Sequence, residues 1–341
     1  MNHIKSVNRV FLTTVIISVL GSFVNGYIFR LTQNYAYIMI LSQIIIILPS
    51  VVYLKIKNIN IVKGIRLNKI NIGNVVLIIL FTYLITPLMG LINLLSTRVV
   101  SNSTEQIMTQ ITSDNSFLLS LILVALVPCI LEETVYRGIF YNEYRKVNVL
   151  KGIILSGFLF GIIHGNFNQF SYAFAMGIIF ALLIEATNSI LSTMIVHFFI
   201  NGTSVFGMYL LPKLNEIMKA FYGEEYVDTT ANVTSGYEIS LSLIANYAIY
   251  AAITSALAFI VFRTIAKRSG RWEYIKNIFK RNKEQTEISQ NDDYNEDGYK
   301  VHSSKKLITA SLIIAIVMCF ILMILNEEPI INILKSIQNL S

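Results

Sequence analysis

The sequence carries little charge for its length of 341 residues. Asp, Glu, Lys and Arg make up only 14% of it, whereas an ordinary soluble domain has about 25%. Hydrophobic residues reach 54% and the mean hydropathy is +0.61, so a soluble fold of this size could not bury all its apolar side chains. Proline is also scarce, with five residues, which excludes a disordered or fibrous chain. The composition predicts a protein that buries apolar surface in lipid.

Cysteine is nearly absent. Cys129 and Cys319 both lie in long apolar runs, far apart in the sequence. This pattern excludes a disulfide framework and a CxxC metal motif, and it predicts that both are small core residues.

Long apolar runs, in contrast, are abundant. A membrane helix needs roughly 20 apolar residues to cross about 30 Å of hydrocarbon. We therefore predict an all-α, polytopic membrane helix bundle of about nine transmembrane helices. Eight is the alternative, because only a short uncharged turn near His164 separates the fifth and sixth. The first run lacks a small-x-small cleavage site, and we interpret it as a retained span. The predicted spans are 10–28, 36–54, 73–95, 117–144, 150–169, 170–186, 189–211, 239–262 and 307–326.

Lysine and arginine are concentrated in alternate loops, whereas loops 97–116 and 212–238 are mixed or acidic. Because cytoplasmic loops carry an excess of basic residues, the pattern predicts a multi-pass cell-membrane protein with a cytoplasmic N-terminus. The net charge of +7 is then a topology signal, and nucleic acid is not an expected partner. The basic residues concerned are Lys5, Arg9, Lys55, Lys57, Lys63, Arg66, Lys69, Arg145, Lys146, Lys151, Arg263, Lys267, Arg268, Arg271, Lys276, Lys280, Arg281 and Lys283.

The basic segment after the eighth span also has a helical pattern. Trp272, Ile275, Ile278 and Phe279 fall on one face of a helix, with cations on the other. Such a helix suits the surface of an anionic leaflet, and a merely basic tail is the alternative. The acidic, asparagine-rich run 284–298 is predicted to be a solvated linker.

Ionisable residues inside the predicted spans are confined to the middle of the chain. Such residues are costly in lipid and are functional candidates by default. Glu185, near the end of the sixth span, is expected at the membrane interface. The others are Glu132, Glu133 and Arg137 in the fourth span, His164 in the fifth, and His197 in the seventh, with Asn201 one turn later.

Helix geometry separates the two adjacent glutamates. Glu133 and Arg137 are four residues apart and can pair on one face, whereas Glu132 is turned away by about 100°. Pro128 removes a backbone donor one turn before Glu132 and is expected to bend the helix there. Glu132 lies 13 residues before Arg145, and His164 lies 13 residues after Lys151. Each is thus about 20 Å from its basic anchor, so the two are predicted to meet inside the bilayer.

The chemistry of this set suits hydrolysis of an amide. A partly desolvated glutamate can act as a base near neutrality, and a neighbouring histidine can help it polarise a water molecule. His197 and Asn201 share a helix face and can both donate hydrogen bonds to the oxyanion of a tetrahedral intermediate. No serine or cysteine stands in an obvious nucleophile motif.

The motifs EExxxR at 132–137, FxxxH at 160–164 and HxxxN at 197–201 occur in this order. The pattern resembles the CPBP family of CAAX-protease and bacteriocin-processing intramembrane endopeptidases. This resemblance implies that Glu132 activates water with help from His164, that Glu133 and Arg137 form a structural pair, and that His197 and Asn201 form the oxyanion site. Flanking residues agree, although Asn188 stands where the family usually has a glycine.

The resemblance predicts an endopeptidase whose partners are the lipid bilayer and a peptide or membrane-protein substrate. No cofactor is favoured, although zinc held by His164, His197 and Glu132 is an alternative. A non-catalytic scaffold or bacteriocin-immunity protein on the same fold is another. A transporter with a proton relay would require an inverted repeat, which the sequence does not show. The oligomeric state is not indicated.

The predicted organisation has five parts. A three-span membrane region is expected at 1–112, the protease core at 113–212, and an extracytoplasmic loop with the eighth span at 213–262. A basic cytoplasmic linker at 263–306 and a last span with its tail at 307–341 complete it.

Overall fold

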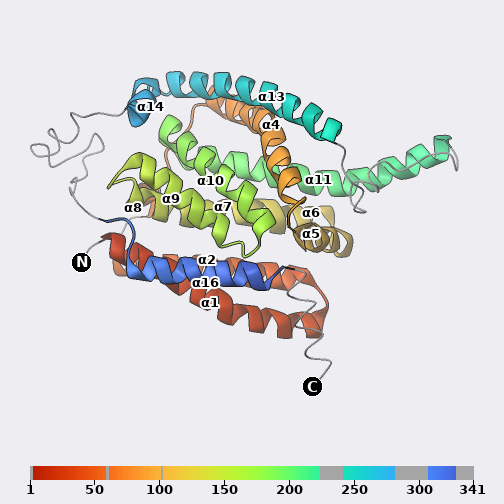
Figure 1. Ribbon diagram of the computed structural model, residues 1–341, viewed down its shortest axis with the longest axis horizontal. Helices are drawn as coiled ribbons and strands as arrows, with labels where there is room; N and C mark the ends of the chain where they lie inside the picture. The colour runs from red at the N-terminus through yellow and green to blue at the C-terminus, as the bar shows by residue number, and fades with distance from the viewer. Residues whose placement is uncertain (1–2, 59–60, 101–102, 223–240, 281–305, 328–341) are drawn as a thin grey trace, which may run out of the picture.

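The computed structural model describes residues 3–58, 61–100, 103–222, 241–280 and 306–327, and the regular elements in these ranges are all helices. A helix occurs at each of the nine predicted spans (Figure 1), so the all-α, polytopic architecture is confirmed. Seven are long and apolar enough to cross a membrane, while α9 and α16 are shorter. The helices are α1 (His3–Thr32), α2 (Tyr35–Ile56), α4 (Ile72–Ser96), the composite α6–α8 (Phe117–Tyr144), α9 (Val149–Ile162), α10 (Phe167–Thr187), α11 (Leu191–Tyr222), α13 (Leu241–Arg268) and α16 (Ala310–Leu325).

The fourth span departs from regular α-helix. It consists of α6 (Phe117–Ser120), the π-helix η1 (Leu121–Leu126), α7 (Val127–Glu133), the π-helix η2 (Thr134–Tyr141) and α8 (Asn142–Tyr144). Pro128 lies at the start of α7 and has no N–H for the carbonyl of Val124, four residues earlier. The Asn201 side chain donates to that carbonyl instead, at 3.0 Å. π-helical segments are frequent at functional sites, and here they flank Glu132 and Glu133 on both sides.

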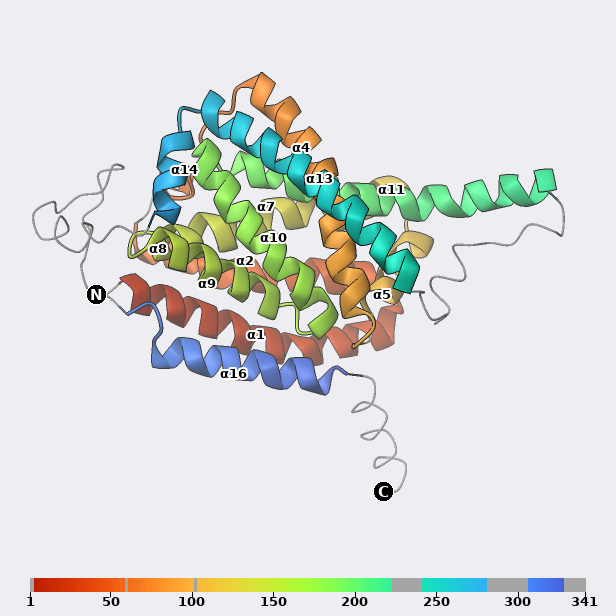
Figure 2. The ribbon, with the colours of Figure 1, turned by 45° about the horizontal axis from the view of Figure 1, so that its top comes forward.

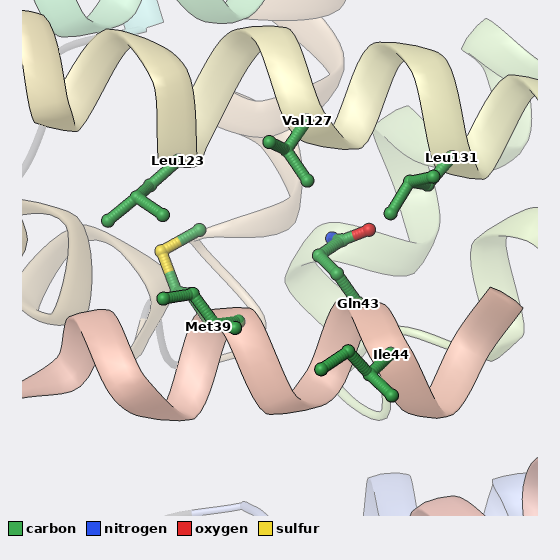
Figure 3. A pocket seen from close by; sticks show the side chains of 7 residues that line it. Met39, Gln43, Ile44, Leu123, Val127 and Leu131 are labelled. Carbon is green, nitrogen blue, oxygen red and sulfur yellow. The ribbon is translucent and has the colours of Figure 1, made fainter. Parts of the chain in front are cut away.

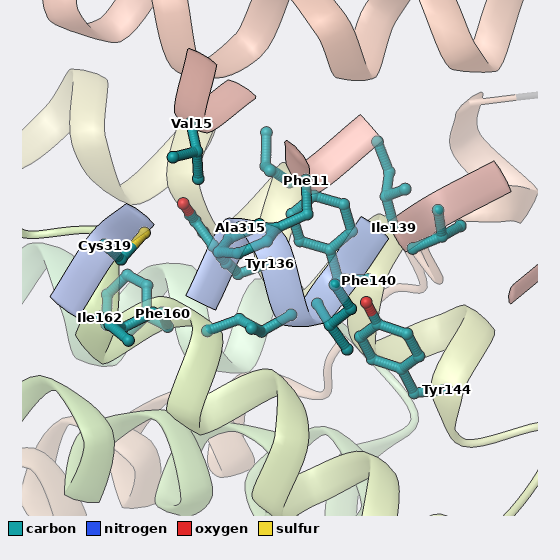
Figure 4. Close-up of a cluster of buried hydrophobic side chains, with 14 of the residues drawn as sticks. Phe11, Val15, Tyr136, Ile139, Phe140, Tyr144, Phe160, Ile162, Ala315 and Cys319 are labelled. Carbon is teal, nitrogen blue, oxygen red and sulfur yellow. The ribbon is translucent and has the colours of Figure 1, made fainter. Parts of the chain in front are cut away.

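The helices lie in layers around this broken span. In Figure 1, α1, α2 and α16 lie on one side of α7, α9 and α10, while α4 and α13 lie on the other. One core cluster joins the first layer to the middle one (Figure 4). There Phe11 of α1 packs edge-on against Phe140 of η2, and Ala315 and Cys319 of α16 are buried beside them. Both cysteines are buried and free, as the sequence predicted.

The helices α9 and α10 approach each other closely where two glycines face each other. A Cβ atom on Gly177 would collide with the backbone of Gly157, so larger residues would force the helices apart. The turn between the helices covers 163–166, and the side chain of Asn166 caps α10 by accepting from the Gln169 N–H. The predicted turn near His164 is therefore present, and only the predicted span limits at 169–170 were a few residues too late, because this cap begins α10 at Phe167.

A second core cluster joins α4, α10 and α13 and also includes the short helix α14 (Trp272–Phe279). A helix at this position was expected, and it is present. Most of its apolar face packs against the protein, so that part does not lie on a leaflet surface as predicted. Ile275 is buried in the protein core, and Trp272 packs against Phe259 while the Arg263 guanidinium lies 5.6 Å from its ring centroid. The predicted linker 284–298 lies outside the described residues.

The remaining described helices are α3 (Ile61–Gly64) and α5 (Ser103–Asp114). The helix α11 continues to Tyr222, well past the predicted end of the seventh span at residue 211, and its far end projects from the bundle (Figure 2). The site residues of this helix lie in its first half, where His197 is buried.

Candidate active site

Glu133 is the centre of a fully buried ionic group. Its Oε1 accepts a hydrogen bond from Arg137 Nη1 at 3.1 Å, one turn along the same span. The same oxygen accepts from His197 Nδ1 of α11 at 3.0 Å. The expected Glu133–Arg137 contact is therefore present, and it extends to His197, which the sequence had not paired with Glu133. Glu133 thus connects two helices and orients the His197 ring.

The Arg137 guanidinium lies between two aromatic rings. Its central carbon is 4.0 Å from the ring centroid of Phe160 on α9 and 4.9 Å from that of Phe180 on α10. Both rings also lie near His197, with centroids 6.2 and 5.8 Å from the imidazole. Cation–π contacts of this kind gain strength where water is excluded, so they help to hold a charge that is only 1% exposed.

Glu132 occupies a different environment, although it is the next residue. Its side chain is half-buried, and its Oε1 accepts one hydrogen bond, from Gln43 Nε2 of α2 at 3.0 Å. No cationic side chain forms an ion pair with it among the described residues. The division between a paired Glu133 and an unpaired Glu132, which helix geometry predicted, is present in the structure.

His164 lies in the turn after α9, where the sequence predicted a short turn, although the predicted span 150–169 ran past it. Its Nδ1 is 2.7 Å from the carbonyl oxygen of Phe160, to which it can donate a hydrogen bond. That bond leaves Nε2 as the ring nitrogen able to face a water molecule or substrate. The Phe160 ring centroid lies 5.1 Å from that of His164 and 6.2 Å from that of His197, and the Glu132 carboxylate lies within electrostatic range of His164. The structure thus brings Glu132, His164 and His197 into one neighbourhood.

Asn201 is one turn from His197, but its amide is partly occupied. Nδ2 donates to the carbonyl of Val124, which lies four residues before Pro128. An amide nitrogen carries two hydrogens, so one is left for a second acceptor. Asn201 therefore also has a structural contact, which the sequence reasoning did not include.

The zinc alternative requires three ligands in one place. Within the part of the chain that the structure describes, no group of three His, Cys, Asp or Glu side chains is placed to hold a metal ion.

Glu185 was expected at the membrane interface, and the structure shows that its side chain lies inside the protein. The residue is fully buried, and its carboxylate receives hydrogen bonds from Arg66 at 2.7 Å, from Tyr141 at 2.8 Å and from Arg145 at 2.8 and 3.0 Å. Arg271 completes the group with a 3.4 Å contact to the carboxylate. Three basic residues from separate segments thus pair with one acid, and this pairing offsets the cost of its burial.

The charge of Glu185 also affects groups beside this cluster. Burial, together with the nearby Glu185 carboxylate, raises the pKa of Tyr274 on α14 to about 12. Burial alone would lower the pKa of the Arg145 guanidinium, but the Glu185 carboxylate raises it above its ordinary value. Arg145 and Tyr274 are also joined by a 3.1 Å hydrogen bond, so α14 is tied to the end of the fourth span.

Asn188, which stands in place of the family's usual glycine, ends α10 with a left-handed backbone (φ 55°). Glycine adopts this conformation without strain, and asparagine tolerates it better than most other residues. The Asn188 side chain accepts a hydrogen bond from Arg66 Nε at 2.9 Å, and Asn68 donates to its carbonyl. The substitution keeps the turn and adds a contact to the segment that follows α3.

Comparison with known families agrees with the motifs. Residues 114–203 match the family model described as type II CAAX prenyl endopeptidase Rce1-like. The match contains all three motifs, and it confirms the predicted resemblance for this segment, which is about a quarter of the chain. The matched family is one of endopeptidases, so the segment is similar to a protease domain. Neither a curated protein nor a solved structure matches the chain.

Proposed function

We propose that this protein is an intramembrane endopeptidase that hydrolyses peptide bonds near the membrane by means of a water molecule activated by Glu132 and His164. The observation that carries the proposal is the different environment of two adjacent carboxylates. Glu133 is buried and bound to Arg137 and His197, whereas Glu132 is half-buried and lies near His164. A carboxylate free of cationic partners keeps its ability to accept a proton.

The proposed water-activating step uses the Glu132 carboxylate and Nε2 of His164. Glu132, assisted by Nε2 of His164, accepts a proton as the water oxygen attacks the peptide carbonyl carbon. The C–N bond then breaks, and the same proton passes to the departing amine. The protons and bonds of the hydrolysis therefore balance without a cofactor. The hydrogen bond from His164 Nδ1 to the Phe160 carbonyl holds the ring in the orientation that presents Nε2.

The oxyanion of the tetrahedral intermediate is proposed to face His197 and Asn201. With Nδ1 bound to Glu133, His197 has Nε2 left to donate when both ring nitrogens carry protons. Asn201 has one amide hydrogen left after its contact with Val124. Each such donor contributes on the order of 3 kcal/mol to lowering the barrier.

The family description and the helices support a proposed substrate class and location. The description of the matched family names prenylated CAAX proteins as substrates, which supports a peptide held at the membrane by a lipid group. The apolar helices support a membrane protein. The loop charges support a cytoplasmic N-terminus in the cell membrane.

Purified protein in lipid vesicles tests the proposal with matched prenylated and unprenylated peptides. Wild-type protein should cleave, Glu132→Gln should bind peptide without cleaving it, and Glu273→Gln on the exposed side of α14 should cleave normally. The zinc alternative predicts instead that 1,10-phenanthroline abolishes cleavage and that added Zn²⁺ restores it. Equal cleavage by wild type and Glu132→Gln would overturn the proposed mechanism, and binding without cleavage by wild type would favour a non-catalytic scaffold.

A further inference from the structure

Gln43 lies in the middle of α2, outside the segment that matches the family model. It is the only amide side chain in this apolar helix, and it is 8% exposed. A polar side chain at this depth is costly unless it has a partner or a function. Gln43 has no charge and belongs to no motif, so the sequence alone does not mark it as a site residue.

The contacts of Gln43 orient both ends of its amide. Nε2 donates to Glu132 Oε1 at 3.0 Å. An ionised carboxylate can only accept hydrogen bonds, so the nitrogen has to face Glu132 and the amide oxygen has to point elsewhere. That oxygen is buried and has no hydrogen-bond partner among the described residues. It is therefore an acceptor held beside the proposed water-activating carboxylate.

Gln43 also lines an apolar cavity of about 160 Å³ between α2 and the η1–α7 segment (Figure 3). It is the one polar side chain in the lining, and Leu131, on the opposite wall, directly precedes Glu132 in the sequence. Ile40 and Ile44 are 45% and 49% exposed, so the cavity lies near the outer surface of the bundle. A cavity of about this volume is large enough for a small apolar group. The remaining lining residues are Met39, Leu123 and Val127.

We propose that Gln43 positions Glu132 through Nε2 and accepts a hydrogen bond from a main-chain N–H of the substrate through Oε1. An apolar side chain of the same substrate residue occupies the cavity. The inference rests on the proposed endopeptidase function, and it adds a specificity site on α2 to the motifs of the matched segment. It predicts a preference for a large apolar residue beside the scissile bond.

Gln43→Met tests both contacts, because it keeps the length of the side chain and removes its polar atoms. Loss of the hydrogen bond to Glu132 should lower kcat by about 10²-fold, as expected when a catalytic group is misplaced by about 1 Å. The matched control is Asn25→Leu, which removes an amide that donates to Ser42 of the same helix at 3.4 Å. This control should keep wild-type kcat, and wild-type kcat in Gln43→Met would overturn the positioning role.

Substrate N-methylation tests the contact with Oε1. A peptide series with one N-methyl group at each amide near the scissile bond should contain one position where kcat/KM of the wild type falls about 10-fold through loss of one hydrogen bond. The same N-methyl group should have no effect on Gln43→Met. An equal loss in both proteins at every position would overturn the contact. Absence of cleavage by wild type would instead refute the endopeptidase function, so the two failures are distinguishable.

Two further variants cover folding and the cavity. If Gln43→Met does not fold, Gln43→Asn keeps the polarity but shortens the reach, and it should show the same fall in kcat. Wild-type kcat in that variant would overturn the positioning role. Val127→Phe should fill the cavity and shift the preference from leucine to alanine at the substrate residue beside the scissile bond. An unchanged preference would overturn the assignment of the cavity.

Discussion

Replacing either of two adjacent glutamates by glutamine should have consequences of very different size for stability and the same consequence for activity. Glu133 is fully buried, and its Oε1 receives hydrogen bonds from Arg137 and His197 at 3.1 and 3.0 Å. Glu133→Gln leaves the Arg137 guanidinium buried without a counter-charge. Removing one partner of a buried ion pair costs about 3–5 kcal/mol. It also releases His197, so cleavage should be lost as well.

Glu132→Gln is the matched control, because the same atom is replaced one residue earlier. Glu132 is half-buried and has one hydrogen bond, from Gln43, so the expected cost is about 0.5–1.5 kcal/mol. The double variant Glu133→Gln/Arg137→Met removes both charges together. It should be more stable than the sum of the single changes predicts, with a coupling of about 1–3 kcal/mol.

The measurement is the free energy of unfolding of the purified protein in mixed detergent micelles, obtained by titration with SDS, together with peptide cleavage. Glu133→Gln should lose activity and most of the stability at stake, whereas Glu132→Gln should lose activity with only the smaller loss of stability. Equal free energies of unfolding for the two single variants would refute the division of roles between the carboxylates. Additivity in the double variant would refute the buried pair.

Three other changes test separate parts of the structure. Asn201→Ala should lower kcat about 10²–10³-fold and leave a measurable residual rate, as when one oxyanion donor is lost, whereas wild-type kcat would exclude that role. Glu185→Gln should lower the free energy of unfolding by about 3–5 kcal/mol in the same titration, because it leaves three arginines without their carboxylate. The control Glu273→Gln, at an exposed position, should change this free energy by only a few tenths of a kcal/mol. An impermeant thiol reagent should label Glu225→Cys from outside intact cells and Asn295→Cys only after permeabilisation, and labelling of both from one side would contradict the nine-span topology.

The helices and the main site residues could be predicted because their signals are local. Apolar runs of about 20 residues indicate membrane helices. The spacing of Glu133 and Arg137 identifies a shared helix face, which leaves Glu132 turned away. These features depend on composition and helix periodicity, and the structure agrees with them.

Contacts between distant segments could not be predicted in this way. Gln43 is 89 residues from Glu132, and the pairing of His197 with Glu133 depends on how α11 packs against the fourth span. The sequence did contain an indication that Glu185 pairs with basic residues. In the predicted topology it lies on the same side of the membrane as Arg66, Arg145 and Arg271. An acid at that position is better placed to pair with these cations than to face the lipid–water interface.

The central claim is that Glu132 makes this protein a protease in the membrane. Its most direct test compares the membrane-associated peptides of cells that produce the wild-type protein with those of cells that produce Glu132→Gln at equal abundance. The account predicts cleaved, membrane-proximal peptides that are present with wild type and absent with Glu132→Gln. Identical peptide sets in the two strains, with both proteins folded in the membrane, would contradict it.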